Sequence, residues 1–146
     1  MFEKILYPTD FSDVAMKAME FIKRLKDAGA KEVILLHIVD KRTLESMAMS
    51  VYSTQDAMKI ESDMIEGARK EMNPIEKTLK DAGLNVKVII EKEIPFRGIL
   101  GVEKRENPSV IIIGSHGKSN IEEMLLGSVS EKVVRKAKKP VLVIKR

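Results

Sequence analysis

Three glycines between residues 114 and 128, in the segment GSHGKSNIEEMLLGS, have the residue type and spacing best suited to binding an anion. Gly114 and Gly117 follow the apolar run SVIIIG, and Gly127 directly precedes Ser128, where we expect a helix to begin. Glycine lets the backbone approach phosphate oxygens closely, and the N–H groups at a helix N-terminus attract negative charge. The segment therefore predicts a polyphosphate site.

Two familiar phosphate motifs do not fit this segment. Gly117, Lys118 and Ser119 match the end of the Walker loop, but Ile112 stands where that motif requires its first glycine. The Rossmann pattern Gly-x-Gly-x-x-Gly is also absent. Ser128 has a second explanation, since Ser128 and Glu131 have the spacing of a helix capping box. Both interpretations stay open, because a capped helix still has unbonded N–H groups.

Five runs rich in valine, isoleucine and leucine alternate with helical stretches, at residues 4–8, 32–39, 85–91, 109–114 and 140–145. This alternation predicts an α/β fold in which helices cover both faces of a parallel sheet, a three-layer sandwich. In such sheets a ligand binds at the carboxyl ends of strands where the winding reverses. We expect the first and fourth strands to flank that point.

The residues after the first strand would then lie beside the glycine segment. Asp10 is placed to bind a ribose hydroxyl, while Thr9 and Ile38 border a base. A plain surface turn explains Pro8, Thr9 and Asp10 equally well. Of the two histidines, we interpret His37 as a core residue, whereas His116 lies in the loop and could meet a phosphate.

The connecting segments give weaker signals. A first helix is expected to begin near Ser12, and the helix over 95–106 to be short or irregular because it contains two glycines. Residues 41–55 are expected to form a flexible stretch or mobile lid. A long helix follows, with a kink or break expected near Asn73, because Pro74 removes a helical hydrogen bond. Four methionines are interpreted as core residues rather than a partner-binding surface: Met47, Met49, Met58 and Met64.

Length and composition restrict the function. The 146 residues suit one domain over 1–146, and a net charge of +4 is weak support for a nucleic-acid partner. The basic segment at 135–139 has no interleaved aromatic residues and adds little to it. The absence of cysteine excludes thiolate metal sites and fits a reducing cytosol. With no signal-peptide pattern and no apolar stretch long enough to cross a bilayer, we expect a cytoplasmic protein without a membrane partner.

The glycine segment resembles the nucleotide-binding class of the universal stress protein family, whose pattern is Gly, two residues, Gly, nine residues, Gly, then Ser or Thr. Gly114, Gly117, Gly127 and Ser128 match every element. KILYPTDFS, VILLHIVD and KPVLVIKR lie where the family has similar segments, so the resemblance covers the whole chain. It implies an adenine nucleotide alpha hydrolase-like fold, with a five-stranded parallel sheet in the order 3-2-1-4-5, and a cytoplasmic homodimer.

The resemblance also implies an ATP site. Its residues here would be Pro8, Thr9, Asp10, Ile38, Ile113, Gly114, Gly117, Gly127, Ser128, Val129 and Ser130. An accompanying Mg²⁺ would be held mainly by phosphates and water, because two isolated histidines make no metal site. The chain departs from the family at Glu93, where a glycine is usual, and at Ser109, where an aspartate is common.

The predicted function is that of an ATP-binding stress-response regulatory protein, a nucleotide-dependent switch. The alternative is a slow Mg-dependent ATPase or nucleotidyl-transfer enzyme that uses the same site. No residue is assigned a catalytic role, because Glu122 and Glu123 are interpreted as solvated helix charges. The final strand, 141–144, has an apolar edge that predicts antiparallel pairing with a second copy. The identity of other protein partners stays open.

Overall fold

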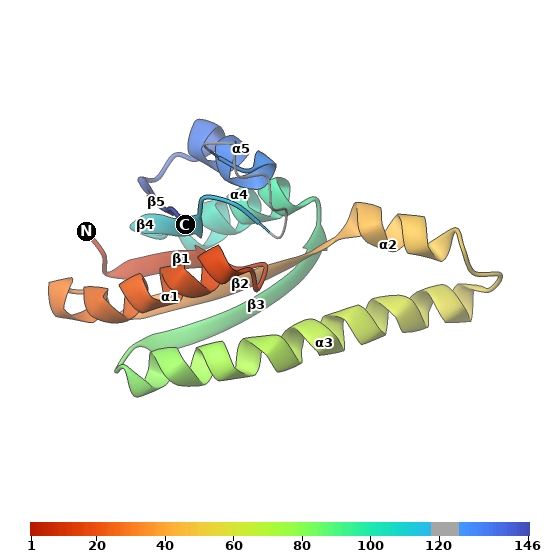
Figure 1. The fold of residues 1–146 in the computed structure, drawn as a ribbon, viewed down its shortest axis with the longest axis horizontal. Coiled ribbons are helices and arrows are strands. Elements are labelled where there is room, and N and C mark those ends of the chain that lie inside the picture. Colours follow the sequence, from red (N-terminus) through yellow and green to blue (C-terminus); the bar gives the residue numbers. More distant parts are fainter. Residues whose placement is uncertain (118–125) are drawn as a thin grey trace.

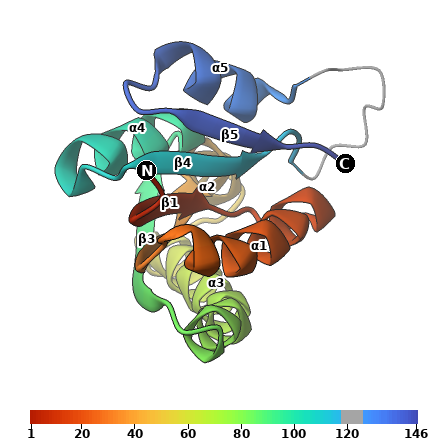
Figure 2. The ribbon, with the colours of Figure 1, turned by 90° about the vertical axis from the view of Figure 1, so that its left-hand side faces the viewer.

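The structure is a computed structural model that describes residues 1–117 and 126–146. Five parallel strands form one sheet in the order β3-β2-β1-β4-β5, which confirms the predicted topology (Figures 1 and 2). The strands are β1 Lys4–Pro8, β2 Glu32–Asp40, β3 Asn85–Glu93, β4 Val110–Gly114 and β5 Val141–Ile144. The described helices are α1 Asp13–Leu25, α2 Lys41–Ala48, α3 Thr54–Asp81, α4 Pro95–Glu106 and α5 Ser128–Lys136, with a short 3₁₀ turn over Lys26–Ala28.

Each face of the sheet has its own apolar core, because successive residues of a strand point to opposite faces. On one face, α1 and α3 cover Ile5 and Tyr7 of β1. On the other, α4 and α5 cover Leu6 of β1 and Ile111 of β4. Figure 2 shows the two helix pairs on opposite sides of the sheet. The predicted three-layer sandwich is therefore confirmed.

The β1–α1 connection begins the site and follows the predicted helix start. Ser12 caps α1, its Oγ accepting the Ala15 N–H at 3.3 Å. The Tyr7 hydroxyl, fully buried, donates to the Ala15 carbonyl at 2.5 Å, and its burial raises its pKa. These bonds hold the first turn of α1 against the end of β1.

The long connection between β2 and β3 differs from the prediction. Residues 41–48 form α2 rather than a flexible stretch, since the Asp40 carboxylate caps this helix and Leu44 is buried. Helix α3 continues through Pro74 without the predicted break. Met72 and Ile75, on either side of the proline, are buried against the sheet, and this burial outweighs the hydrogen bond that proline removes.

The expectation of a short or irregular helix over 95–106 is wrong. Helix α4 is regular over Pro95–Glu106 despite its glycines. At Gly98 a Cβ atom would lie 2.5 Å from the Ile38 Cδ1 atom, so glycine allows α4 to pack closely on β2.

The methionines of the α2–α3 arm are not core residues. Met47, Met49 and Met58 are 40%, 88% and 64% exposed, although Met64 is half-buried. This arm, which comprises α2 and the N-terminal part of α3, extends beyond the sheet in Figure 1. Of the described helices, none is both long and apolar enough to cross a membrane.

Candidate functional site

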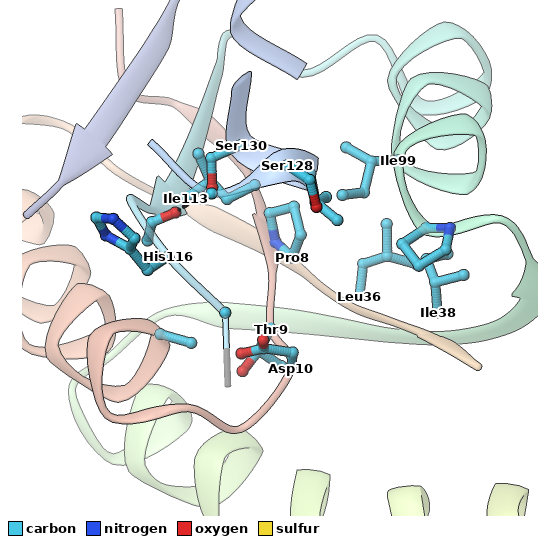
Figure 3. A pocket seen from close by; sticks show the side chains of 16 residues that line it. Pro8, Thr9, Asp10, Leu36, Ile38, Ile99, Ile113, His116, Ser128 and Ser130 are labelled. Carbon is cyan, nitrogen blue, oxygen red and sulfur yellow. Dashed lines mark hydrogen bonds between the residues drawn. The ribbon is translucent and has the colours of Figure 1, made fainter. Parts of the chain in front are cut away.

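A pocket of about 290 Å³ lies at the carboxyl ends of β1 and β4, where the winding of the sheet reverses (Figure 3). All the residues predicted for the site line it: Pro8, Thr9, Asp10, Ile38, Ile113, Gly114, Gly117, Gly127, Ser128, Val129 and Ser130. The pocket also includes Ala15, Leu36, Pro95 and Ile99, which were not predicted, and His116. Segments from both halves of the chain thus converge on one cavity.

One end of the pocket is apolar. Leu36 and Ile38 project from β2 toward Ile99 of α4, with Pro8 beside them, as Figure 3 shows. Leu36 and Ile99 are almost fully buried, and Ile38 is 9% exposed. Leu36 lies two residues before Ile38 on the same face of the strand, a period that could have revealed it. This end of the pocket can receive a flat, weakly polar ring.

The β1–α1 turn supplies the polar side of the pocket, and it is more ordered than a plain surface turn. Thr9 is 5% exposed, and its N–H donates to the Leu36 carbonyl at 2.8 Å. Its Oγ1 accepts the Phe11 N–H at 3.1 Å, and Asp10 Oδ1 accepts the Ser12 N–H at 3.0 Å. The turn therefore holds a carboxylate at the pocket wall.

The three glycines make close contacts that have nothing to do with a ligand. A Cβ atom at Gly117 would lie 2.6 Å from Asp10 Oδ2, and one at Gly114 would lie 2.9 Å from the Val14 Cγ1 atom. At Gly127 a Cβ atom would lie 3.3 Å from the Cα atom of His116, and the Gly127 N–H donates to the Ser115 carbonyl at 2.7 Å. Close packing therefore requires Gly117 and Gly114, and Gly127 joins the two ends of the loop. Lys118, Ser119, Glu122 and Glu123 lie outside the described residues.

The N-terminus of α5 corrects the capping-box prediction. Gly127, not Ser128, is the N-cap, and among the described residues no side chain caps the helix. The Glu131 side chain pairs with Arg135 instead of reaching back. The first helical hydrogen bond runs from the Glu131 N–H to the Gly127 carbonyl at 2.9 Å. The N–H groups of residues 128–130 thus precede the helical ladder at the pocket wall, a position that favours an anion.

Ser130 and His116 complete the wall of the pocket. The buried Ser130 Oγ donates to the Gly114 carbonyl at 2.6 Å, which ties α5 to the end of β4. His116 Nδ1 lies 2.8 Å from Ser115 Oγ. His37 lies outside the lining, with its Nδ1 atom 2.8 Å from the Thr9 carbonyl oxygen. Within residues 1–117 and 126–146, no group of three or more His, Cys, Asp or Glu side chains is arranged for a metal ion.

The two departures from the expected family pattern have local structural roles away from the loop. Glu93 Oε1 accepts the Ile94 N–H at 2.9 Å and pairs with Lys41 at 3.2 Å, and these contacts hold the pKa of the Glu93 carboxyl below its usual value. Ser109 Oγ accepts the Lys4 N–H at 2.8 Å, which joins the starts of β1 and β4. Neither residue lines the pocket.

A parallel sheet wound in this order, with a glycine loop at its reversal point, defines a class of α/β proteins that hold ligands at the carboxyl ends of their strands. The chain belongs to the universal stress protein family, since the model of that family matches residues 1–145. It is 42% identical to universal stress protein MJ0577 of Methanocaldococcus jannaschii over 156 residues, covering 100% of this chain and 96% of that one.

Solved structures agree with this assignment. A structure of hypothetical protein MJ0577 superposes with a TM-score of 0.90 at 43% identity, covering 100% of this chain and 97% of that one. A universal stress protein in complex with cAMP has a TM-score of 0.65 at 19% identity, over 99% of this chain and 97% of the other. An Arabidopsis thaliana family member with AMP bound has a TM-score of 0.63 at 18% identity, over 98% and 91%. The last two likenesses establish the fold alone.

Proposed function

We propose that this protein binds ATP in the pocket and acts as a nucleotide-dependent switch in a stress response. The observation that carries the proposal is the convergence of an apolar slot, a fixed carboxylate and an uncapped helix N-terminus on a single cavity. Two proteins of the same fold were crystallised with adenine nucleotides, cAMP in one and AMP in the other.

Each part of the pocket suits one part of the nucleotide. The slot formed by Leu36, Ile38 and Ile99 would take the adenine ring. Asp10 would accept a hydrogen bond from a ribose hydroxyl, since an ionised carboxylate is an acceptor only. The phosphates would meet the N–H groups at the start of α5 and the backbone at Gly117 and Gly127.

A Mg²⁺ ion would neutralise part of the phosphate charge. Such an ion commonly keeps several waters and binds through substrate phosphates, so it does not need a cage of carboxylates. The described lining offers one carboxylate, Asp10, and the hydroxyl of Ser128 at the helix start. We therefore assign the metal to the nucleotide phosphates and water, with Ser128 as a candidate protein ligand.

The proposal includes the assembly and location of the protein. We propose one functional domain over residues 1–146, a homodimer formed through the β5 edge, and a cytoplasmic location. Pairing of β5 would satisfy backbone groups that face away from β4. Partner proteins would then bind the dimer with an affinity that depends on its bound nucleotide.

We expect ATP with Mg²⁺ to bind at least about tenfold more tightly than adenosine, because charge-assisted bonds to the phosphates add to contacts with the nucleoside. Isothermal titration calorimetry with ATP, AMP and adenosine measures this difference. Equal affinity for ATP and adenosine would contradict the proposal that the start of α5 and the glycines bind the phosphates. Absence of binding to all three would remove the proposed function.

We expect ATP turnover far below the roughly 10 per second typical of enzymes. Within the described lining, Asp10 is the only carboxylate and there is no arginine or lysine to stabilise a transferring phosphoryl group. Asp10 Oδ1 already accepts the Ser12 N–H. Phosphate release should be measured for the wild type, Asp10→Ala and His116→Ala. Rapid release that either substitution abolishes would instead support the ATPase alternative.

A further inference from the structure

We propose that His37 and Phe11 are positioning residues that hold Asp10 ready for a ribose, and that they thereby give the site a preference for ribonucleotides over deoxyribonucleotides. This inference rests on the proposed function, and it assigns a role to two residues outside the pocket lining. Neither residue needs to touch the nucleotide.

The first observation is the left-handed backbone conformation of Phe11. Its φ angle is 66°, and Asn107 is the only other non-glycine residue of the described chain with a positive φ. Asparagine tolerates this left-handed region, whereas a bulky phenylalanine does so only where its surroundings impose it. Such strained residues gather at ligand-binding sites. Here the strain lies directly beside Asp10.

His37 supplies the constraint from the neighbouring strand. Its Nδ1 atom lies 2.8 Å from the Thr9 carbonyl oxygen, and because that oxygen can only accept, Nδ1 carries the hydrogen. The same imidazole ring stacks on the Phe11 ring, with centroids 4.6 Å apart and planes inclined by 28°. One half-buried side chain of β2 therefore holds the residue before Asp10 and the residue after it.

This double contact holds the backbone on both sides of Asp10, whose carboxylate lies between Ser12 and Gly117. Asp10 Oδ1 accepts the Ser12 N–H at 3.0 Å, and Oδ2 lies against Gly117. A hydrogen bond to a hydroxyl requires a donor–acceptor distance of about 2.5–3.0 Å. If the turn relaxed, Asp10 would need to be ordered again on each binding event, at an entropic cost. His37 and Phe11 remove that cost in advance.

The histidine offers a matched pair of variants. His37→Asn removes the ring but keeps an N–H donor near the position of Nδ1, whereas His37→Phe keeps a ring for stacking and removes the donor. Phe11→Gly accepts the positive φ without strain and removes the stacking partner. Asp10→Ala removes the carboxylate itself. Phe21→Ala serves as the control, because Phe21 is 41% exposed on α1 and lies outside the pocket.

The measurement is the affinity of each protein for ATP, 2′-deoxy-ATP and 3′-deoxy-ATP by calorimetry, with circular dichroism and thermal unfolding to establish that each variant is folded. We expect the wild type and Phe21→Ala to prefer ATP over the weaker deoxynucleotide by about tenfold or more, the scale of one hydrogen bond to a charged group. Asp10→Ala should abolish this preference. His37→Phe and Phe11→Gly should reduce it by lowering the affinity for ATP while leaving that for the deoxynucleotide nearly unchanged. His37→Asn should retain more of it than His37→Phe.

The outcomes separate the inference from the proposed function. If the wild type binds ATP without a ribose preference, or if folded His37→Phe and Phe11→Gly keep the full preference, the positioning role is wrong while ATP binding stands. If the wild type binds no nucleotide, the proposed function fails and the inference fails with it. If His37→Phe does not fold, Phe11→Gly and His37→Asn decide the matter.

Discussion

Replacing Gly117 with valine is expected to weaken ATP binding by about a hundredfold or more, because the new side chain would displace a carboxylate and enter the space of a phosphate. A Cβ atom at this position would lie 2.6 Å from Asp10 Oδ2, so Asp10 must move. The substitution thus disturbs the ribose and phosphate ends of the site together. Calorimetry with ATP and Mg²⁺ measures the loss, and an unchanged circular dichroism spectrum establishes that the fold is intact.

Gly67→Val is the matched control for this experiment. Gly67 lies in α3, and nothing lies within 4 Å of a Cβ atom there, so valine meets open space. We expect this variant to bind ATP as the wild type does. An ATP affinity of Gly117→Val within threefold of the control would contradict the placement of the nucleotide beside Asp10.

Replacing Val143 with proline is expected to convert the proposed dimer into a monomer. The carbonyls of Pro140, directly before β5, and of Ile144 accept N–H groups of Ile111 and Ser115, so the backbone groups of both residues face β4. Because backbone direction alternates along a strand, Val141 and Val143 present their N–H and C=O groups to the outer edge. Proline at 143 removes one outward donor and leaves the ladder to β4 in place.

Sedimentation velocity at micromolar concentration measures this change. Val143→Ala keeps the donor and shortens the side chain, so it should remain largely dimeric. ATP affinity should change much less than assembly in both variants, because the strand lies outside the pocket lining. A wild-type protein that sediments as a monomer would refute pairing through the β5 edge.

The strands were predictable because a strand that is buried on both faces has an uninterrupted run of apolar residues. Ile34 and Leu35 are adjacent in β2 but enter different cores, and both are fully buried. A strand of this kind needs an unbroken apolar run, and a helix of the same few residues would not bury every side chain. The parallel order then follows from the helices between the strands.

The helices were less predictable because distant contacts override local preference. Pro74 weakens a helix because it stands in the helix interior, yet Met72 and Ile75 gain more by burial than the helix loses. In the sequence, Gly98 indicates a weak helix. In the structure, glycine allows α4 to approach Ile38 closely, and this contact joins segments far apart in the chain. The exposed methionines of the arm had a spacing that suits burial as well as exposure.

The residues that line the pocket were more predictable than the contacts among them. The glycine spacing and the reversal point of the sheet indicated the turn after β1, Ile38, the three glycines and Ser128, whereas Ile113, Val129 and Ser130 were implied by the family resemblance. All of them lie in the pocket lining. The contact of Asp10 with Gly117 and the stacking of Phe11 on His37 were not predictable, since each joins residues from different elements. The capping-box interpretation of Ser128 was wrong by one residue, because helix boundaries are where sequence predictions are weakest.

The position of β1 also has a consequence for the order of folding. It is the first strand of the chain and the middle strand of the sheet, so one of its edges pairs with β2 and the other must await β4. The bond from the Lys4 N–H to Ser109 Oγ closes a loop of 105 residues. Contacts between such distant segments are slow to form, and synthesis delivers β4 only after the first three strands. Because the pocket lies between β1 and β4, we expect it to be completed in the last stage of folding, so that a nucleotide would bind only to a chain whose two halves have joined.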